Sequence, residues 1–463
     1  MQIKKTEISK IFTIFLFSHL IIWTAGPSLL NSNLPLDTIE HIAWGNGWPL
    51  GWEKHPPLNV WFPELIYQIF GSQDWAFYLL SQIFVVSSFI IIFKFSQDFF
   101  QNQMHSLISV LLLESIFFYN FTTPEFNVNV CPLPFWSLTV FYCWKAVKKD
   151  NSIDWLLFGI FAAFGILSKY LFFYLLAGIV IFFIITIFKN KKINFKYILP
   201  IISCLIVVSP HIFWLVENNY TTINYGIFRS VDDPLSGFGD SKYLSHIFYP
   251  MIFLIKQIGV LSIFFAMIFF IVSKFKIRIN YNDKKLLFLI SITVVPVILM
   301  FLTSMITGVR IRTMGMAPFY LFIGVFFVYI FQNKIYLHKV KNLLLLFVFV
   351  FFLSPVIYYV SAVTQKDKRT DYPGKKISLI VQAQWNNNFS NKIEQVVGFG
   401  WIDGWFAQNL SYHLPSRPKW VTQLESEPNI GTVWIKDFNK INECNGVLYQ
   451  IKNFNDICMF GKK

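Results

Sequence analysis

Charged residues are scarce in this sequence of 463 residues: Asp, Glu, Lys and Arg together make up 14% of it. Hydrophobic residues make up 55%, and the mean hydropathy is +0.52. This apolar surface exceeds what one soluble core can bury, which excludes an ordinary soluble protein. The net charge of +14 does not indicate nucleic-acid binding, because the lysines form short clusters between apolar stretches and no continuous basic face.

Cysteine is also rare, and the sequence has neither an internal repeat nor a low-complexity linker. Cys131, Cys143 and Cys204 lie in or beside apolar segments, whereas Cys444 and Cys458 lie in the polar C-terminal region. Their spacing is not that of a zinc site. If the C-terminal region is outside the cytoplasm, Cys444 and Cys458 can form a disulfide, and otherwise they are two unpaired thiols.

Eleven apolar stretches approach the length of about 20 residues that a membrane-spanning helix needs. They lie near residues 11–30, 75–93, 106–120, 132–147, 153–168, 171–188, 197–216, 247–272, 286–305, 315–331 and 342–362. The chain is therefore expected to be an all-α polytopic membrane protein. The first stretch has an alternative interpretation as a cleaved signal peptide, because the small residues Thr24, Ala25 and Gly26 follow its apolar run.

Positive charge alternates between the loops, as expected when Lys and Arg mark the cytoplasmic side. The basic stretches are the N-terminus, the turn near Lys94 and residues 145–150, 189–196, 274–285 and 334–341. The outer loops are then residues 31–74, 121–131, a turn around Lys169, residues 217–246 and 306–314, and everything after about 363.

The composition changes near residue 363, where polar residues and short β-like runs such as QVVGF and GTVWI begin. We expect residues 1–362 to form a transmembrane domain and residues 363–463 to form a small α/β domain outside the cytoplasm.

Near the start of the first outer loop, two carboxylates, Asp37 and Glu40, lie three residues apart. On a helix they share one face, where crowding raises one pKa and suits a general base or a cation site. The alternative is a solvated helix start with Asp37 as its N-cap.

Further along the same loop, Lys54 and His55 precede Pro56 and Pro57, which makes a rigid cationic turn able to hold a phosphate. A helix start with proline in its first turn and a snorkelling lysine is the alternative.

Polar residues gather at the other outer loops as well. Glu125, Asn127 and Asn129 border an apolar segment, where polar groups need partners. Lys169 interrupts a long apolar stretch, either as a hairpin turn or as a residue with a phosphate or carboxylate partner.

Cations are least expected on the outer side, yet Arg310 and Arg312 fall in an outer turn, and His211 approaches the outer face near Trp214. A planar guanidinium suits a phosphate or a sugar carboxylate. The alternative is nonspecific binding of lipid headgroups.

These pieces occur in an order that resembles one known family. They are Asp37 with Glu40, then GWEKHPPLNVW, TPEFNVN, LSKY, PHIFWLVENN, TGVRIR and DYPGKKIS with a following Trp385. The chain resembles the polyprenyl-phosphate-sugar-dependent glycosyltransferases of the GT-C superfamily. Within that superfamily it resembles the branch of the protein O-mannosyltransferases, the lipid A aminoarabinose transferase and the lipopolysaccharide core galacturonosyltransferases.

The resemblance implies an inverting hexosyl or pentosyl transferase of the bacterial inner membrane, with its active site and C-terminal domain on the periplasmic side. Its donor is a polyprenyl-phosphate sugar, and its acceptor is a lipid, lipopolysaccharide or protein. Family members have an acidic pair where this chain has Asp37 and Thr38, so the role of Glu40 stays open.

We assign Asp37 as the base and Glu40 as its partner or as a metal or acceptor ligand. The substrate-binding candidates are Lys54, His55, Glu125, Asn127, Lys169, Arg310 and Arg312. No cofactor is specified, and a divalent cation is left open because the metal-ligand spacing does not decide it.

A transporter or flippase of lipid-linked sugars is the alternative function, and it predicts charges along a path through the bilayer. In this sequence the ionisable residues concentrate at the outer edge instead. A non-enzymatic assembly scaffold is a third possibility, and it predicts no dependence on the carboxylates.

Overall fold

The computed structural model describes residues 5–231, 242–272, 280, 282–335, 340–422, 429–436, 444, 446–452 and 454–462. Parts of three predicted loops, residues 217–246, 274–285 and 334–341, lie outside the described residues. The chain divides into two compact units, and each is described by itself.

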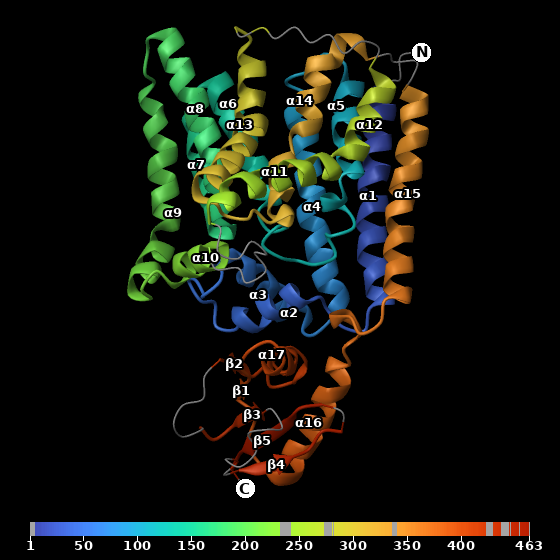
Figure 1. The fold of residues 1–463 in the computed structure, drawn as a ribbon, viewed down its shortest axis with the longest axis vertical. Helices are drawn as coiled ribbons and strands as arrows, with labels where there is room; N and C mark the ends of the chain where they lie inside the picture. The colour runs from blue at the N-terminus through green and yellow to red at the C-terminus, as the bar shows by residue number, and fades with distance from the viewer. Residues whose placement is uncertain are drawn as a thin grey trace. The chain divides into compact units, whose positions relative to one another are not determined.

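The first unit consists of Met1–Gly26, Leu50–Leu58 and Ser81–Val360 and is helical (Figure 1). Its α-helices are α1 (Lys5–Leu30), α4 (Asp74–Ser96), α5 (Gln103–Leu111), α6 (Leu133–Lys149), α7 (Ser152–Ser168), α8 (Phe173–Asn190), α9 (Ile198–Glu217), α10 (Thr221–Val231), α11 (Lys242–Val260), α12 (Ser262–Ile271), α13 (Lys284–Thr307), α14 (Ile323–Phe331) and α15 (Val340–Thr364). The first residues of α4 and the last of α1 and α15 belong to the second unit.

Local sequence explains where several of these helices begin and end. The side chains of Asn102, Asn151 and Asp283 accept hydrogen bonds from backbone N–H groups in the first turns of α5, α7 and α13. Gly308 ends α13 in the left-handed conformation with φ +67°, which glycine adopts without strain.

Six described helices are long and apolar enough to cross a membrane, or up to eight if each of two bent pairs is one span. These pairs, around Leu261 and around Leu321, bend by 50° and 52°. The polytopic membrane class is confirmed, but the predicted count of eleven is not. One reason is the predicted span 106–120, where α5 ends at Leu111 and two short 3-10 helices, η1 (Leu112–Ser115) and η2 (Phe117–Tyr119), follow.

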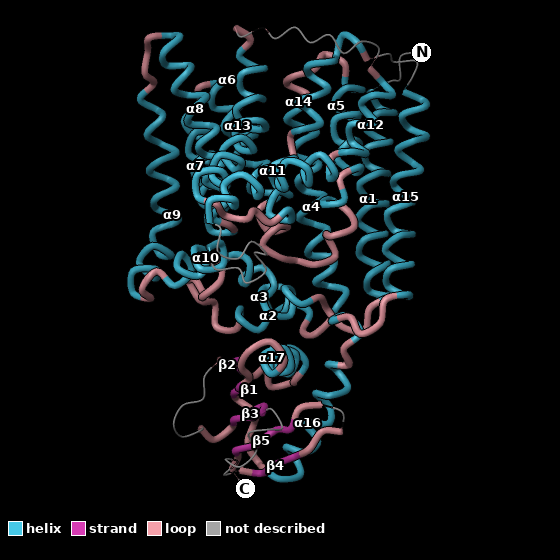
Figure 2. Tube along the Cα trace, in the orientation of Figure 1, coloured by secondary structure: helices cyan, strands magenta, loops and turns pink. Residues whose placement is uncertain are grey.

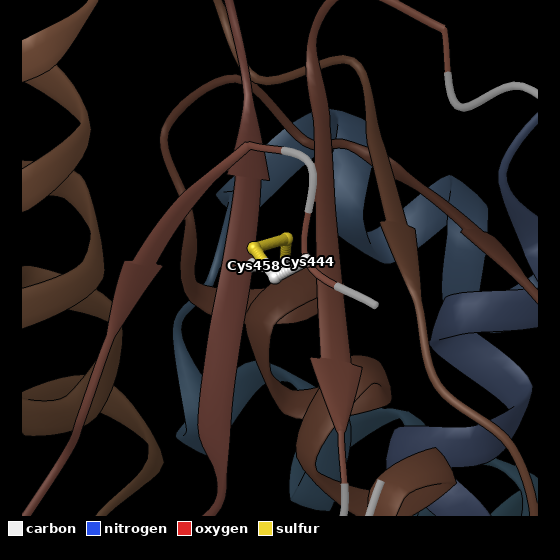
Figure 3. Close-up of a disulfide and its surroundings, with 2 residues drawn as sticks. All are labelled: Cys444 and Cys458. Carbon is white, nitrogen blue, oxygen red and sulfur yellow. A yellow bond between two sulfur atoms is a disulfide. The ribbon is translucent and has the colours of Figure 1, made fainter. Parts of the chain in front are cut away.

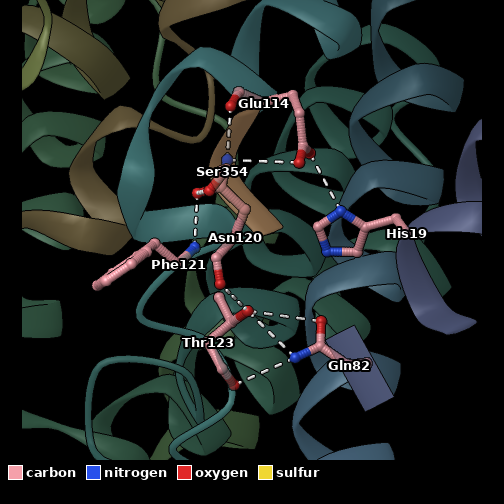
Figure 4. A network of polar contacts seen from close by, with 7 residues as sticks. All are labelled: His19, Gln82, Glu114, Asn120, Phe121, Thr123 and Ser354. Atoms are coloured by element: carbon pink, nitrogen blue, oxygen red, sulfur yellow. Dashed lines mark hydrogen bonds and ion pairs between the residues drawn. The ribbon is translucent and has the colours of Figure 1, made fainter. Parts of the chain in front are cut away.

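A buried polar network explains the break after Leu111 (Figure 4). His19 Nδ1 lies 3.1 Å from Glu114 Oε2, and Asn120 Nδ2 donates to the Glu114 carbonyl oxygen at 2.6 Å. Thr123 Oγ1 then donates to the Asn120 carbonyl oxygen at 2.7 Å, and Gln82 Nε2 donates to Thr123 Oγ1 at 3.1 Å. The network satisfies polar groups that a regular apolar helix would leave unpaired.

The second unit consists of Pro27–Pro49, Asn59–Leu80 and Ser361–Lys463. It contains α2 (Leu36–Gly45), α3 (Leu58–Phe70), the short 3-10 helix η8 (Arg369–Asp371), α16 (Gly374–Asn388) and α17 (Asp403–His413). Its five strands are β1 (Gln395–Val397), β2 (Lys419–Val421), β3 (Thr432–Lys436), β4 (Val447–Tyr449) and β5 (Asp456–Phe460), drawn in magenta in Figure 2.

The strands form one mixed sheet in the order β2-β1-β3-β5-β4. β1 is parallel to β2 and β3, with Gln395 opposite Lys419 and Thr432, whereas β5 is antiparallel to β3 and β4. The connection from β1 to β2 runs through α17, as parallel pairing requires. Val381, Trp385 and Val433 lie in the buried core of this domain, which confirms the predicted small α/β domain.

Cys444 and Cys458 form a disulfide with their Cα atoms 5.8 Å apart (Figure 3). Of the two alternatives for these thiols, the structure therefore has the bridge. Cys458 lies in β5, so the bridge ties the segment before β4 to the sheet.

The second unit also includes two N-terminal segments, Pro27–Pro49 and Asn59–Leu80, beside the C-terminal residues. Ile39 and Ile42 of α2 are buried in one apolar cluster with Phe77, Trp405 and Tyr412. The helix that carries Asp37 and Glu40 thus packs on α17 of the C-terminal domain. The predicted division at residues 362 and 363 stays a prediction.

Candidate functional site

Helix α2 presents the two predicted acids. Its N-cap is Pro35, so Asp37 lies inside the first turn and is not the N-cap that one alternative assigned to it. Asp37 and Glu40 are three residues apart on the helix and both are partly exposed, while Ile39 and Ile42 between and after them are fully buried. The amphipathic pattern therefore fixes the face on which the acids lie.

A largely buried arginine from the far end of the chain, with its side chain 12% exposed, holds α2 in place. Arg417 Nη2 donates to the Ile42 carbonyl oxygen at 2.6 Å and to Glu64 Oε2 at 2.9 Å, and Arg417 Nη1 donates to the Ser411 carbonyl oxygen at 2.9 Å. The guanidinium also lies 4.1 Å from the ring centroid of Tyr67. We call Arg417, Glu64, Ile42, Ser411 and Tyr67 the Arg417 clamp.

The clamp joins α2, α3 and α17. Glu64 is 1% exposed and also accepts from Gln68 Nε2 at 2.6 Å. Gly45 brings α2 against α3 so closely that a Cβ there would lie 2.6 Å from the Val60 carbonyl oxygen. Burial raises the pKa of Tyr67, and the neighbouring Arg417 lowers it in part.

Sequence reasoning missed Glu64 and Arg417. A carboxylate inside the apolar run WFPELIYQIF is a signal that was present in the sequence. Nothing in the local sequence around Arg417, its partner 353 residues away, indicates the pairing.

In the first unit, Lys54 and His55 lie in the loop that precedes Pro56 and Pro57, and both side chains are partly exposed. The ring of His55 contacts the rings of Trp52 and Tyr225 at centroid distances of 5.6 and 6.5 Å.

Two hydrogen bonds fix the backbone of this loop: His211 Nδ1 with the Leu50 carbonyl oxygen at 2.7 Å, and Thr222 Oγ1 to the Trp52 carbonyl oxygen at 2.6 Å. A Cβ at Gly51 would lie 2.4 Å from the Trp214 ring. This close approach requires glycine.

His211 connects this loop to the turn that contains Lys169. Its Nε2 lies 2.7 Å from the Tyr170 hydroxyl, while its Nδ1 faces the Leu50 carbonyl oxygen. The imidazole ring of His211 thus bridges residues 50 and 170, which gives this histidine a structural role beside the predicted outer loops.

Lys169 ends α7 in an extended backbone conformation, and its Nζ donates to Asn129 Oδ1 at 2.6 Å. In the same loop Asn127 Nδ2 donates to Glu125 Oε2 at 3.1 Å, and the Asn129 backbone N–H donates to Asn127 Oδ1 at 2.9 Å. The structure therefore brings Glu125, Asn127 and Lys169 into one hydrogen-bonded group, which we call the Lys169 group.

The segment with the predicted arginines lies between α13 and the 3-10 helix η5 (Thr313–Tyr320). Arg310 is partly exposed and Arg312 is exposed. A Cβ on Gly315 of η5 would lie 3.7 Å from Lys169 Nζ, so the helix that follows the arginines packs beside the Lys169 group.

The predicted acids and the predicted cations belong to different compact units. The first unit contributes several cations with amide and hydroxyl groups, a set suited to an anionic group. The second unit contains a pair of carboxylates on α2, the helix that the Arg417 clamp contacts. Among the described residues, no group of three or more His, Cys, Asp or Glu side chains is arranged to hold a metal ion.

Parts of the chain match a known family and a curated relative. Residues 54–214 match the family described as dolichyl-phosphate-mannose-protein mannosyltransferase. Lipopolysaccharide core galacturonosyltransferase RgtB from Rhizobium johnstonii is 22% identical over 245 residues, which are 52% of this chain and 48% of that protein. The match thus spans about half the length of this curated relative.

Among solved structures, the crystal structure of ArnT from Cupriavidus metallidurans bound to undecaprenyl phosphate superposes with a TM-score of 0.64. The identity is 12%, and the superposition covers 98% of each chain. The likeness extends over the helical unit and the C-terminal domain, and it confirms the predicted fold.

Proposed function

We propose that this chain is a membrane glycosyltransferase of the GT-C superfamily, and that it transfers a sugar from a polyprenyl phosphate to a hydroxyl group of a lipid, lipopolysaccharide or protein acceptor. The observation that carries the proposal is the Lys169 group, in which a lysine, a carboxylate and two amides meet inside the region that matches the mannosyltransferase family.

The names of the relatives support the substrate classes. ArnT was crystallised with undecaprenyl phosphate, which supports a polyprenyl-phosphate donor. RgtB is named as a lipopolysaccharide core galacturonosyltransferase, which supports a glycan or lipid acceptor and a sugar that carries a carboxylate.

In the proposed reaction the acceptor hydroxyl attacks the anomeric carbon of the donor sugar. The bond from that carbon to the phosphate oxygen breaks, its electron pair stays on the phosphate, and the hydroxyl proton goes to Asp37. One displacement of this kind inverts the anomeric configuration. A positioned base and cations that stabilise the growing phosphate charge are what the step requires.

We assign the proton transfer to Asp37 and give Glu40 the role of its partner, as an acceptor or divalent-cation ligand. The donor phosphate and sugar are assigned to Lys54, His55, Glu125, Asn127, Lys169, Arg310 and Arg312. Lys169 is the strongest of these candidates, because Asn129 fixes the position of its ammonium group at 2.6 Å.

The proposed location is a bacterial inner membrane, with the acids and the C-terminal domain on the periplasmic side. The alternation of basic loops supports this orientation. The disulfide between Cys444 and Cys458 supports it independently, because such bonds persist in oxidising compartments.

The test is sugar transfer by the full chain reconstituted with a radiolabelled polyprenyl-phosphate sugar and a lipopolysaccharide core acceptor. Asp37→Asn is expected to lower the rate by about 10² or more, the usual contribution of a general base. Glu394→Gln, which removes an exposed carboxylate from the C-terminal domain, is the matched control.

Transfer at the wild-type rate by both Asp37→Asn and Glu40→Gln would exclude the catalytic assignment. Movement of the labelled lipid across the bilayer without transfer would identify a flippase instead.

A further inference from the structure

An arginine in the second unit lies over the rings of two tryptophans. The guanidinium carbon of Arg369 lies 5.1 Å from the ring centroid of Trp401 and 5.0 Å from that of Trp405. Among the described residues, no carboxylate is paired with it: Asp371 pairs with Lys368, and Asp403 bonds to Asn455. Arg369 is thus a fixed cation without a neutralising anion in this part of the chain.

Two hydrogen-bond donors near Arg369 are also unsatisfied. The Tyr372 hydroxyl and Trp405 Nε1 are buried and have no hydrogen-bond partner among the described residues. The two rings contact each other at a centroid distance of 5.6 Å, and Trp405 is 4% exposed. Buried donors are rarely left unpaired, so their presence beside an unneutralised cation points to an anionic ligand.

The loop between β1 and α17 places apolar side chains in the solvent next to this cation. Phe399, Trp401 and Ile402 are 74%, 71% and 67% exposed. Gly398 and Gly400 set the loop's course, because a Cβ at Gly398 would lie 2.3 Å from the Asp403 carbonyl oxygen and Gly400 has φ +72°. Such a cluster of exposed apolar side chains marks an interaction site.

Hydrogen bonds join the chain around Arg369 to the ends of α1 and α15. The backbone N–H groups of Ser32 and Asn33, just after α1, both donate to the Thr370 carbonyl oxygen at 2.9 and 3.0 Å. Lys368 Nζ donates to the carbonyl oxygen of Ala362 in the last turn of α15. Both helices are among the six that are long and apolar enough to cross a membrane, and α15 ends at Thr364, a few residues before Arg369.

The composition of the segment around Arg369 is typical of a membrane interface. Residues 366–376 contain Lys366, Lys368, Arg369, Lys375 and Lys376 against two aspartates. Basic residues next to a membrane helix attract anionic lipids, and tryptophan is enriched in the headgroup region.

We propose that Arg369, stacked on Trp401 and Trp405, binds the phosphate of an anionic phospholipid of the surrounding membrane, and that Phe399, Trp401 and Ile402 enter the headgroup region beside it. The site anchors the C-terminal domain to the bilayer surface. It does not depend on sugar transfer, so the two proposals stand or fall separately.

The first experiment measures contact with lipid in the full chain. Ile402→Cys and Ile430→Cys variants are each labelled with the fluorophore NBD and placed in nanodiscs that contain phosphatidylglycerol and a phospholipid with a nitroxide near the headgroup. Ile430 is the matched control, because it is 63% exposed and lies at the opposite, amino end of β1 and β3. Quenching several-fold stronger at residue 402 is expected, and equal quenching at both residues would overturn the proposal.

The second experiment measures the phosphate preference. Nanodiscs of phosphatidylglycerol and phosphatidylcholine are analysed by native mass spectrometry for lipid retained on the protein. Arg369→Gln is expected to lower the preference for phosphatidylglycerol by about tenfold, the loss of one charge-assisted contact. Arg369→Lys is expected to keep part of this lipid preference, because lysine retains the charge without the planar stack. Lys419→Gln, which removes another exposed cation, is expected to leave the preference unchanged.

Two outcomes overturn the assignment. The first is an unchanged lipid preference in Arg369→Gln. The second is full displacement of phosphatidylglycerol by millimolar inorganic phosphate, which would identify a site for free phosphate. Should Arg369→Gln fail to fold, Phe399→Asp tests the same contact at an exposed position, and unchanged quenching at residue 402 in that variant contradicts the proposal.

Discussion

Replacing Arg417 by glutamine removes the guanidinium that the Arg417 clamp is built around. The Glu64 carboxylate, 1% exposed, would keep its contact with Gln68 but lose the cation 2.9 Å away. The Ile42 carbonyl oxygen would lose a donor at 2.6 Å. Breaking a buried ion pair by removing one partner costs about 3 to 5 kcal/mol, because an uncompensated charge stays behind.

The loss is expected to fall on α2, since Ile42 belongs to it and Asp37 lies at its other end. Hydrogen exchange of peptides covering residues 36–45 measures local opening of this helix. With each 1.4 kcal/mol equal to a factor of ten, exchange there is expected to accelerate by roughly 10² to 10³ at constant pH. Sugar transfer should fall with it, because the proposed base loses its position.

The double variant Glu64→Gln with Arg417→Gln separates the ion pair from general damage. Since it leaves no unpaired charge, its exchange is expected to be slower than the sum of the two single effects predicts. Lys392→Gln, at an exposed cation of the same unit, is the control. Unchanged exchange in α2 for Arg417→Gln, or strict additivity in the double variant, would refute the reasoning.

Three further predictions concern other parts of the chain. Lys169→Gln should lower kcat/KM for the polyprenyl-phosphate donor by roughly 10- to 100-fold, the worth of one charged contact, with Lys169→Arg partly restoring it in the transfer assay. Burial lowers the pKa of His413 to about 4, and an unfolded histidine titrates near 6.5. Between these two pH values the unfolded state binds more protons than the folded state, so the free energy of unfolding should fall by up to about 3 kcal/mol as the pH falls from 6.5 to 4. Thermal unfolding of wild type and His413→Gln at several pH values checks this. An equal pH dependence in both proteins would contradict it. Cys444→Ser should destabilise the C-terminal domain by roughly 3 kcal/mol through loss of loop closure, and dithiothreitol should lower the melting temperature of the wild type but not of the variant.

The sequence by itself determined the class of the fold and much of the local chemistry. Hydropathy and charge alternation identify a multi-pass helical protein, because these are local properties of the chain. The polar C-terminal composition with its short β-like runs predicted the α/β domain. The order of short motifs predicted the GT-C fold, and the spacing of Asp37 and Glu40 indicated that they share one face if that segment is helical.

The number of membrane-spanning helices could not be predicted from local sequence. An apolar stretch such as residues 106–120 has the composition of a helix, but Glu114 and Asn120 join a network with His19 that ends the helix early. That partner comes from another helix, 95 residues away.

Only the tertiary structure decided which polar residues meet. Lys169 pairs with Asn129 across 40 residues, and Glu64 pairs with Arg417 across 353. It also decided that Cys444 and Cys458 are bonded, and that the helix carrying Asp37 packs on the C-terminal domain. The physical reason is that periodicity and composition report on neighbours along the chain, whereas a buried charge is stabilised by whichever partner the fold brings within hydrogen-bonding distance.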